Sequence, residues 1–116
     1  GVGPGDIDIA QTSAPFSFAN LMMLEELGFC RAGEGGAFAQ SGGIDYSGGL
    51  PFNTNGGYLS FGQVAQGLYN LQETIDQIHG RAEGRQVADV ECGIVHGHGG
   101  PLACHSVVIV SKEPTR

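Results

Sequence analysis

The stretch Asn53-Thr-Asn-Gly-Gly-Tyr-Leu-Ser-Phe-Gly-Gln63 is a glycine-broken loop pattern that leads into the clearest helix signal of the sequence. Gly80 supplies the usual stop signal for that helix. Apolar residues recur between them at the spacing of one helix face, at Val64, Leu68, Leu71, Ile75 and Ile78. The free N–H groups and partial positive charge at the start of such a helix suit a carbonyl oxygen or an anionic ligand. Taken alone, the stretch is more typical of an ordinary loop before a packed helix.

The segments on either side predict short regular elements. Alternating and turn residues predict strands over residues 6–10, 90–95 and 104–110, the last two antiparallel and joined by a turn over 96–101. A buried helix is predicted over 18–27, with Ser17 as candidate N-cap and Gly28 as its stop. The glycine-rich residues 31–52 predict a loop, and a loop of that length in a small domain needs a function or a neighbour to lie on.

Composition indicates one small domain that relies on a partner surface. The chain has 116 residues, of which 41% are hydrophobic, only 15% are charged and 21 are glycine. The net charge of −7, from 5 basic and 12 acidic residues, argues against nucleic acid as a partner, because phosphate binding needs clustered Lys and Arg. No apolar run is long enough to cross a bilayer, and the first residues lack a signal-peptide pattern. We therefore expect a cytoplasmic protein that binds neither nucleic acid nor membrane.

The cysteines are Cys30, Cys92 and Cys104, an odd number with no CxxC spacing. This pattern indicates neither a disulfide framework nor a zinc site. We expect buried or half-buried thiols in a reducing compartment, and no bound metal.

Two imidazoles fall in the glycine-rich stretch His96-Gly-His-Gly-Gly. They could bind a metal, act as acid and base, or donate to an oxyanion, although histidines one residue apart rarely share a metal without help from Cys or a carboxylate. A hairpin turn with one buried, hydrogen-bonded histidine explains the pattern equally well, and both interpretations stay open. His79 and His105 are expected on the surface. Ser13 lies in no GxSxG motif, and Gly33-Glu-Gly-Gly is no dinucleotide fingerprint, so a hydrolase triad and dinucleotide binding are not indicated.

Five stretches, taken in order, carry a family pattern. Asp6-Ile-Asp-Ile-Ala-Gln-Thr-Ser-Ala-Pro-Phe-Ser17 resembles a strand-to-helix stretch with an NEAF or HDCF motif, and residues 24–36 resemble the segment after it. Residues 53–63 resemble an N-x-x-GG stretch before a GHP motif, residues 80–87 a linker, and residues 96–100 a closing CxG-type or HN-type loop. Together they resemble the C-terminal part of the thiolase superfamily, in particular the lipid-transfer thiolases of the sterol-carrier-protein-x type and related steroid side-chain aldolases.

This resemblance implies an α/β fold, the last portion of the C-terminal half of a thiolase, with a mixed sheet packed by helices and incomplete alone. Residues 1–116 would then be a fragment or a small subunit. The implied partners are the missing N-terminal thiolase half or another thiolase-like chain, a zinc-ribbon/OB-fold protein that binds acyl-CoA, and further copies in a homo-oligomer.

The resemblance also implies site residues. Ser13, Gln63 and His96 stand where the family keeps the Asn or His of NEAF or HDCF, the catalytic His of GHP and the Cys of CxG. Gln63 cannot take up a proton, which sets this chain apart from an ordinary thiolase. The implied catalytic residues are His96, Gln63, Ser13 and His98. The implied substrate-binding residues are Asn55, Gly56, Gly57, Tyr58 and Phe16. We expect Ser13, Gln63 and His96 to converge at one pocket.

The function implied by the resemblance is carbon–carbon bond cleavage or formation on a coenzyme A thioester, of acyltransferase or aldolase type, in lipid, steroid or aromatic acyl-CoA metabolism. The alternative is a non-catalytic thiolase-like subunit that binds acyl-CoA or scaffolds a partner. The replacement of the family's histidine by Gln63 favours the alternative, whereas the two histidines of the closing loop favour catalysis.

Overall fold

The computed structural model describes residues 1–62 and 65–114, and a three-stranded sheet lies at their centre. Strands β1 (Ile9–Thr12), β2 (Cys92–Gly99) and β3 (Cys104–Ser111) follow in that order across the sheet. β1 and β2 run parallel, whereas β2 and β3 form an antiparallel hairpin. The sheet is therefore mixed, and the antiparallel pairing of the last two strands is confirmed.

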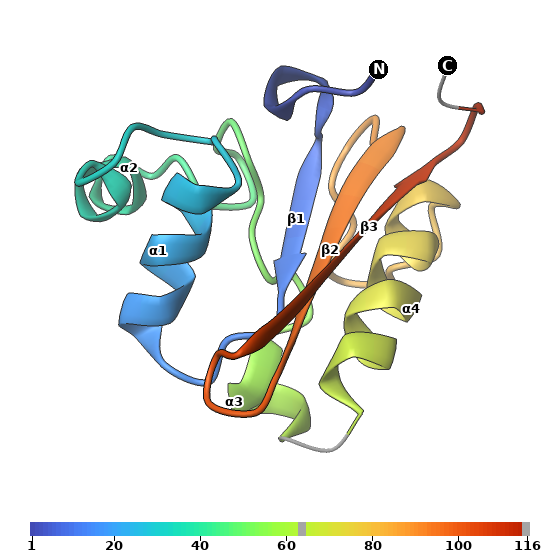
Figure 1. The fold of residues 1–116 in the computed structure, drawn as a ribbon. Coiled ribbons are helices and arrows are strands. Elements are labelled where there is room, and N and C mark those ends of the chain that lie inside the picture. The colour runs from blue at the N-terminus through green and yellow to red at the C-terminus, as the bar shows by residue number, and fades with distance from the viewer. Residues whose placement is uncertain (63–64, 115–116) are drawn as a thin grey trace.

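Helices cover both faces of this sheet (Figure 1). α1 (Ser17–Glu26) and α2 (Gly35–Gln40) lie on one side, and α4 (Gln66–Ile78) lies on the other. The short helix α3 (Gly57–Phe61) lies near the carboxyl end of β1, and the 3-10 turn η1 (Pro4–Asp6) precedes that strand. The described residues thus form the α/β architecture that the resemblance implies.

The apolar core lies between the sheet and α1. It consists of the buried residues Ile7, Ala10, Leu24, Leu50 and Ile94. Burial of a Leu or Ile side chain contributes about 1.5–3 kcal/mol, so the Leu and Ile side chains of this cluster stabilise the packing of α1 on the sheet.

α4 packs on the opposite face through polar side chains. Its buried residues are Gln66, Asn70, Glu73, Thr74 and Gln77. A Cβ at Gly93 of β2 would lie 2.5 Å from Cγ2 of Thr74, so glycine allows helix and sheet to approach closely. None of the apolar residues of α4 is fully buried against the sheet, and Leu68 is 68% exposed. This arrangement reverses the usual packing of an amphipathic helix, whose apolar face normally covers the core.

Glu73 is the centre of the polar layer beneath α4. Its Oε1 accepts hydrogen bonds from Thr54 Oγ1 at 2.8 Å and Gln77 Nε2 at 3.0 Å, and Arg85 Nη2 donates to Oε2 at 2.9 Å. Burial opposes ionisation, but the hydrogen bonds from Arg85, Gln77 and Thr54 outweigh it and hold the pKa of Glu73 below its usual value. The carboxylate therefore ties the loop before α3 to the segment after α4.

Several predicted boundaries are wrong. The strand expected over 6–10 begins at Ile9, because Pro4–Asp6 forms a turn and the Asp8 carboxylate accepts the N–H groups of Glu91 and Cys92. The expected turn over 96–101 is strand as far as Gly99, which pairs with Cys104, so both histidines lie in β2. Phe16, not Ser17, occupies the N-cap of α1.

The segments expected to be loops also contain helices. α2 lies within residues 31–52, where the Gly35 N–H donates to the Glu25 carboxylate at 2.9 Å. A Cβ at Gly35 would lie 2.7 Å from the Leu21 carbonyl oxygen, so this glycine serves close packing of α2 on α1. α3 lies within residues 53–63. The start of the long helix expected at Val64 falls outside the described residues.

Candidate active site

The candidate active site lies at the carboxyl ends of the parallel strands β1 and β2. Ser13 directly follows β1 and is buried. Its backbone N–H donates to the carbonyl oxygen of His96 on β2 at 2.9 Å. Because Thr12 and His96 are register partners, residues from opposite ends of the chain meet here.

Ser13 also contacts Tyr58 of α3 and His98 of β2. The hydroxyl oxygens of Ser13 and Tyr58 are 3.1 Å apart, within hydrogen-bond distance. The His98 and Tyr58 ring centroids are 6.5 Å apart, and His98 Nδ1 is hydrogen-bonded to the Ser13 carbonyl oxygen. Since a carbonyl oxygen only accepts, a neutral His98 carries its proton on Nδ1 and keeps a lone pair on Nε2. Two hydroxyl groups and the His98 imidazole ring therefore gather around Ser13.

His96 lies deeper than His98, with 2% of its surface exposed. Its Nε2 is 2.9 Å from Nδ1 of His105 on β3, and its own Nδ1 has no hydrogen-bond partner among the described residues. Burial lowers the pKa of His96, and the neighbouring His105 and His98 lower it further. His96 is therefore a neutral imidazole at neutral pH.

A cavity of about 440 Å³ adjoins this cluster. Its lining comes from the segment after β1, the start of α1 and the loop leading into α3, and it includes Phe16, Asn20, Asn53, Gly56, Gly57 and Tyr58. The cavity is partly apolar and has the Tyr58 side chain in its wall. Such a mixed lining can hold an apolar acyl group beside a few polar contacts.

The loop from Asn53 to Gly57 is held in place by its own asparagines. Asn53 adopts a left-handed φ of 48°, and its Oδ1 accepts the Thr12 N–H at 2.7 Å. Asn55 Nδ2 donates to Asn70 Oδ1 at 3.0 Å, while Asn55 Oδ1 accepts the Gly57 N–H at 2.8 Å. Asn55 thus fixes the entry to α3 from inside, while Gly56, Gly57 and Tyr58 face the cavity.

The expected site residues therefore fall into three groups. Ser13, His96 and His98 lie together, and Phe16 and Tyr58 lie at the adjoining cavity. Asn55 supports the loop. Gln63 lies outside the described residues, so its convergence with Ser13 and His96 stays a prediction.

Sequence reasoning missed the direct contacts of Tyr58 and His105. Tyr58 belongs to a short helix that glycine-rich sequence conceals, and His105 reaches His96 only through the register of the hairpin. Because side chains alternate between the two faces of a strand, the sequence could have assigned His105 to one face of β3, but not to a contact with His96.

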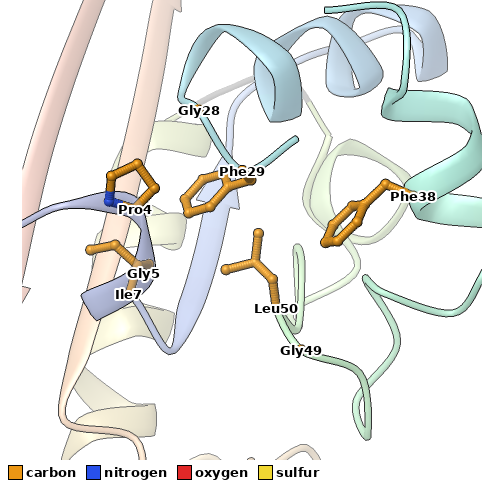
Figure 2. A pocket seen from close by; sticks show the side chains of 8 residues that line it. All are labelled: Pro4, Gly5, Ile7, Gly28, Phe29, Phe38, Gly49 and Leu50. Carbon is orange, nitrogen blue, oxygen red and sulfur yellow. The ribbon is translucent and has the colours of Figure 1, made fainter. Parts of the chain in front are cut away.

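A second cavity, of about 400 Å³, lies far from this cluster at the amino end of β1 (Figure 2). Figure 2 shows Phe29, Phe38 and Leu50 around it, together with Pro4 and Ile7. None of its lining residues has a titratable or nucleophilic side chain. The reactive side chains Ser13, Tyr58 and His98 lie instead near the carboxyl end of β1.

Among residues 1–62 and 65–114, no group of three or more His, Cys, Asp or Glu side chains is arranged to hold a metal ion. Within the same residues, no helix has the length and apolar character needed to cross a bilayer.

Comparison with known proteins gives one consistent family. A family model described as thiolase C-terminal domain-like matches residues 1–112. An acetyl-CoA acetyltransferase of Methanothermobacter thermautotrophicus is 35% identical over 111 residues, covering 94% of this chain and 29% of the relative. A 17-hydroxy-3-oxo-4-pregnene-20-carboxyl-CoA lyase of Mycobacterium tuberculosis is 37% identical over 91 residues, covering 78% of this chain and 23% of the relative.

A solved structure agrees with these relatives. A chain of the Ltp2-ChsH2(DUF35) aldolase superposes with a TM-score of 0.85 at 29% identity, covering 98% of this chain and 29% of that chain. The chain thus spans less than a third of the length of the proteins it matches.

Proposed function

The chain belongs to the thiolase C-terminal domain-like family, and from that premise we propose that it contributes the Ser13–Tyr58–His98 cluster to an acyl-CoA active site. The reaction proposed is cleavage or formation of a carbon–carbon bond next to a coenzyme A thioester. The observation that carries this proposal is the meeting of two hydroxyls and an imidazole ring, of which Tyr58 also lines a partly apolar cavity.

The proposed roles follow from the donors and lone pairs of the cluster. One of the two hydroxyls of Ser13 and Tyr58 donates to the other, so the second keeps its proton free to donate to the thioester carbonyl oxygen. Nε2 of His98 can take a proton. In a retro-aldol cleavage, the base takes the proton of the substrate hydroxyl and the carbon–carbon bond breaks. The electron pair of that bond passes into the thioester as an enolate, whose oxygen the free hydroxyl donor stabilises, and the other fragment leaves as a ketone or aldehyde. The proton taken up by His98 then returns to the enolate carbon. His96, behind His98 on the same strand, is the second acid–base group.

The cysteines favour this aldol type of chemistry over thiolysis by this chain. A thiolate nucleophile needs a lowered pKa. Burial raises the pKa of Cys30, with Glu25 and Glu34 adding to it, and burial together with nearby aspartates raises the pKa of Cys92. Neither Cys30 nor Cys92 is therefore suited to act as the nucleophile of an acyl transfer.

The proposed assembly includes more than this chain. Large apolar side chains remain exposed on α1, α4 and β3, among them Phe18, Leu68, Val107 and Ile109. The N-terminal half of a thiolase, or another thiolase-like chain, is the proposed cover for these surfaces, within a homo-oligomer in the cytoplasm. The superposed aldolase is named for a DUF35 component beside Ltp2, which supports a further partner protein. We propose that this partner binds acyl-CoA.

The rival proposal is a non-catalytic thiolase-like subunit that binds acyl-CoA. It is favoured by Gln63, which stands where the family keeps a proton-accepting histidine and cannot replace it. Binding without turnover would be its signature.

Kinetics of the complete protein separate the two proposals. A panel of 3-hydroxyacyl-CoA and 3-oxoacyl-CoA thioesters is assayed for cleavage, and acyl-CoA binding is measured by calorimetry. Loss of a general base typically lowers the rate about a hundredfold to ten-thousandfold, so His98→Ala should fall by that range, whereas the exposed His79→Ala should not change. Binding with no turnover of any thioester would favour the non-catalytic subunit. Turnover that is equal in His98→Ala and the parent would overturn the catalytic role of the cluster.

A further inference from the structure

His105 is an exposed residue of β3 that is nevertheless hydrogen-bonded at both ring nitrogens. Its Nε2 lies 3.1 Å from the Leu102 carbonyl oxygen, and its Nδ1 lies 2.9 Å from Nε2 of His96. The rings of His96 and His105 are stacked, with 5.2 Å between their centroids. A surface imidazole held at both nitrogens has a fixed orientation, which a solvated side chain would lack.

These contacts assign the protons of both rings. The Leu102 carbonyl oxygen can only accept, so Nε2 of His105 carries a proton. In a neutral imidazole the other nitrogen then has a lone pair, so Nδ1 of His105 accepts. His96 must supply the shared proton from its Nε2. The remaining nitrogen, Nδ1 of His96, is left with a lone pair and has no partner among the described residues.

The hairpin turn between β2 and β3 holds the Leu102 carbonyl oxygen in place for its contact with His105. Leu102 has a φ of 58°, a left-handed conformation that is costly for a branched residue. Its N–H donates to the Gly100 carbonyl oxygen at 3.0 Å, and the Ala103 N–H donates to that of Gly99 at 3.2 Å. Backbone strain that the surroundings maintain is common at functional sites, and here it aims the Leu102 carbonyl at His105.

We propose that His105 is a positioning residue that holds His96 in the tautomer with its proton on Nε2 and a free lone pair on Nδ1. This inference rests on the proposed function, because the free lone pair matters only if His96 exchanges a proton during the reaction.

His96 is buried and neutral, so a hydrogen-bond partner decides which of its ring nitrogens carries the proton. Burial, reinforced by His105 and His98, lowers the pKa of His96, so the ring stays neutral. A neutral imidazole without a fixed neighbour distributes its proton between both nitrogens. Fixing the wrong tautomer of a catalytic histidine can cost up to about ten-thousandfold in turnover. Without His105 the His96 ring would sample the correct tautomer part of the time but would also lose the hydrogen bond that orients it, so we expect a smaller loss, of at least about tenfold.

The first test measures the proton positions directly in the complete protein. Histidine labelled with ¹⁵N is incorporated, and long-range ¹H–¹⁵N spectra at neutral pH are assigned with His96→Gln and His105→Asn. The expected result is an unprotonated Nδ1 and a protonated Nε2 on His96. A protonated Nδ1 on His96 in the parent protein would overturn the proposal. This readout needs no substrate, so it decides the inference even if no acyl-CoA thioester is turned over.

The second test uses a loss and a rescue at the same position. His105→Leu removes the acceptor, whereas His105→Asn puts an amide oxygen near the place of Nδ1 and should keep the His96 tautomer. We expect turnover at least about tenfold lower in His105→Leu and largely restored in His105→Asn, with His79→Leu unchanged as the control. A parent-like His96 tautomer in His105→Leu would contradict the positioning role, as would equal loss in the Leu and Asn variants.

Discussion

Replacement of Arg85 by alanine is the sharpest stability test of the polar layer beneath α4. Arg85 donates to the Glu73 carboxylate from Nη2 at 2.9 Å and from Nε at 3.4 Å. The Glu73 side chain is only 4% exposed, whereas that of Arg85 is 43% exposed. The variant therefore leaves a buried carboxylate without its counter-charge, while the hydrogen bonds from Thr54 and Gln77 remain.

The magnitude follows from those contacts. Loss of one partner of a fully buried pair costs about 3–5 kcal/mol. Here water can reach part of the Arg85 position, one of its two hydrogen bonds is long, and two neutral donors still solvate Glu73. We therefore expect a loss of about 2 kcal/mol in the free energy of unfolding, close to one hydrogen bond to a charged group.

Arg81 provides a matched control close to the same helix. It pairs with Asp76 at 3.2 Å, but the two side chains are 59% and 25% exposed. Such surface pairs contribute about 0–1 kcal/mol, so Arg81→Ala should cost little. Urea unfolding of the complete protein at neutral pH measures both variants. Equal losses in Arg85→Ala and Arg81→Ala would refute the view that Glu73 is a buried, compensated charge.

Three further predictions concern charge, assembly and metal. The pKa of Glu73 is below its usual value in the folded chain, so its contribution to the free energy of unfolding is present above the unfolded pKa and is lost as the pH falls through the folded pKa. Glu73→Gln should therefore weaken the loss of stability in acid. An unchanged pH profile of stability would contradict this. Residues 1–116 alone should not form a cooperative monomer, because Leu68, Val107 and Val108 are exposed; sedimentation showing a monomer with cooperative unfolding would count against it. Elemental analysis should find no stoichiometric zinc, and zinc that disappears with His96→Ala would sink that expectation.

The helix α4 shows what hydrophobic periodicity can predict from sequence and what it cannot. The spacing of its apolar residues predicted a helix that stops before Gly80, and α4 ends at Ile78 with His79 as its C-cap. Periodicity could not say which face packs on the sheet. The polar face is buried because Glu73, Thr74 and Gln77 find partners, among them Thr54 and Arg85 in distant segments. Only the tertiary structure brings those distant partners together.

The candidate site shows the same limit. The resemblance placed Ser13 and His96 in one site, and parallel pairing of β1 with β2 brings them together. The roles of Tyr58 and His105 depend on a five-residue helix and on the hairpin register, which a glycine-rich sequence does not reveal. Hydrogen-bond partners between distant residues follow from geometry rather than from local sequence pattern.

The most direct test of the proposed site is a crystal structure of the complete protein with a non-cleavable acyl-CoA thioester analogue. We expect the carbonyl oxygen of the analogue within hydrogen-bond distance of the Ser13 or Tyr58 hydroxyl, with the acyl group in the cavity lined by Phe16 and Gly57. An analogue bound with its carbonyl away from both hydroxyls, or with its acyl group in the cavity at Phe29 and Leu50, would contradict the proposed site.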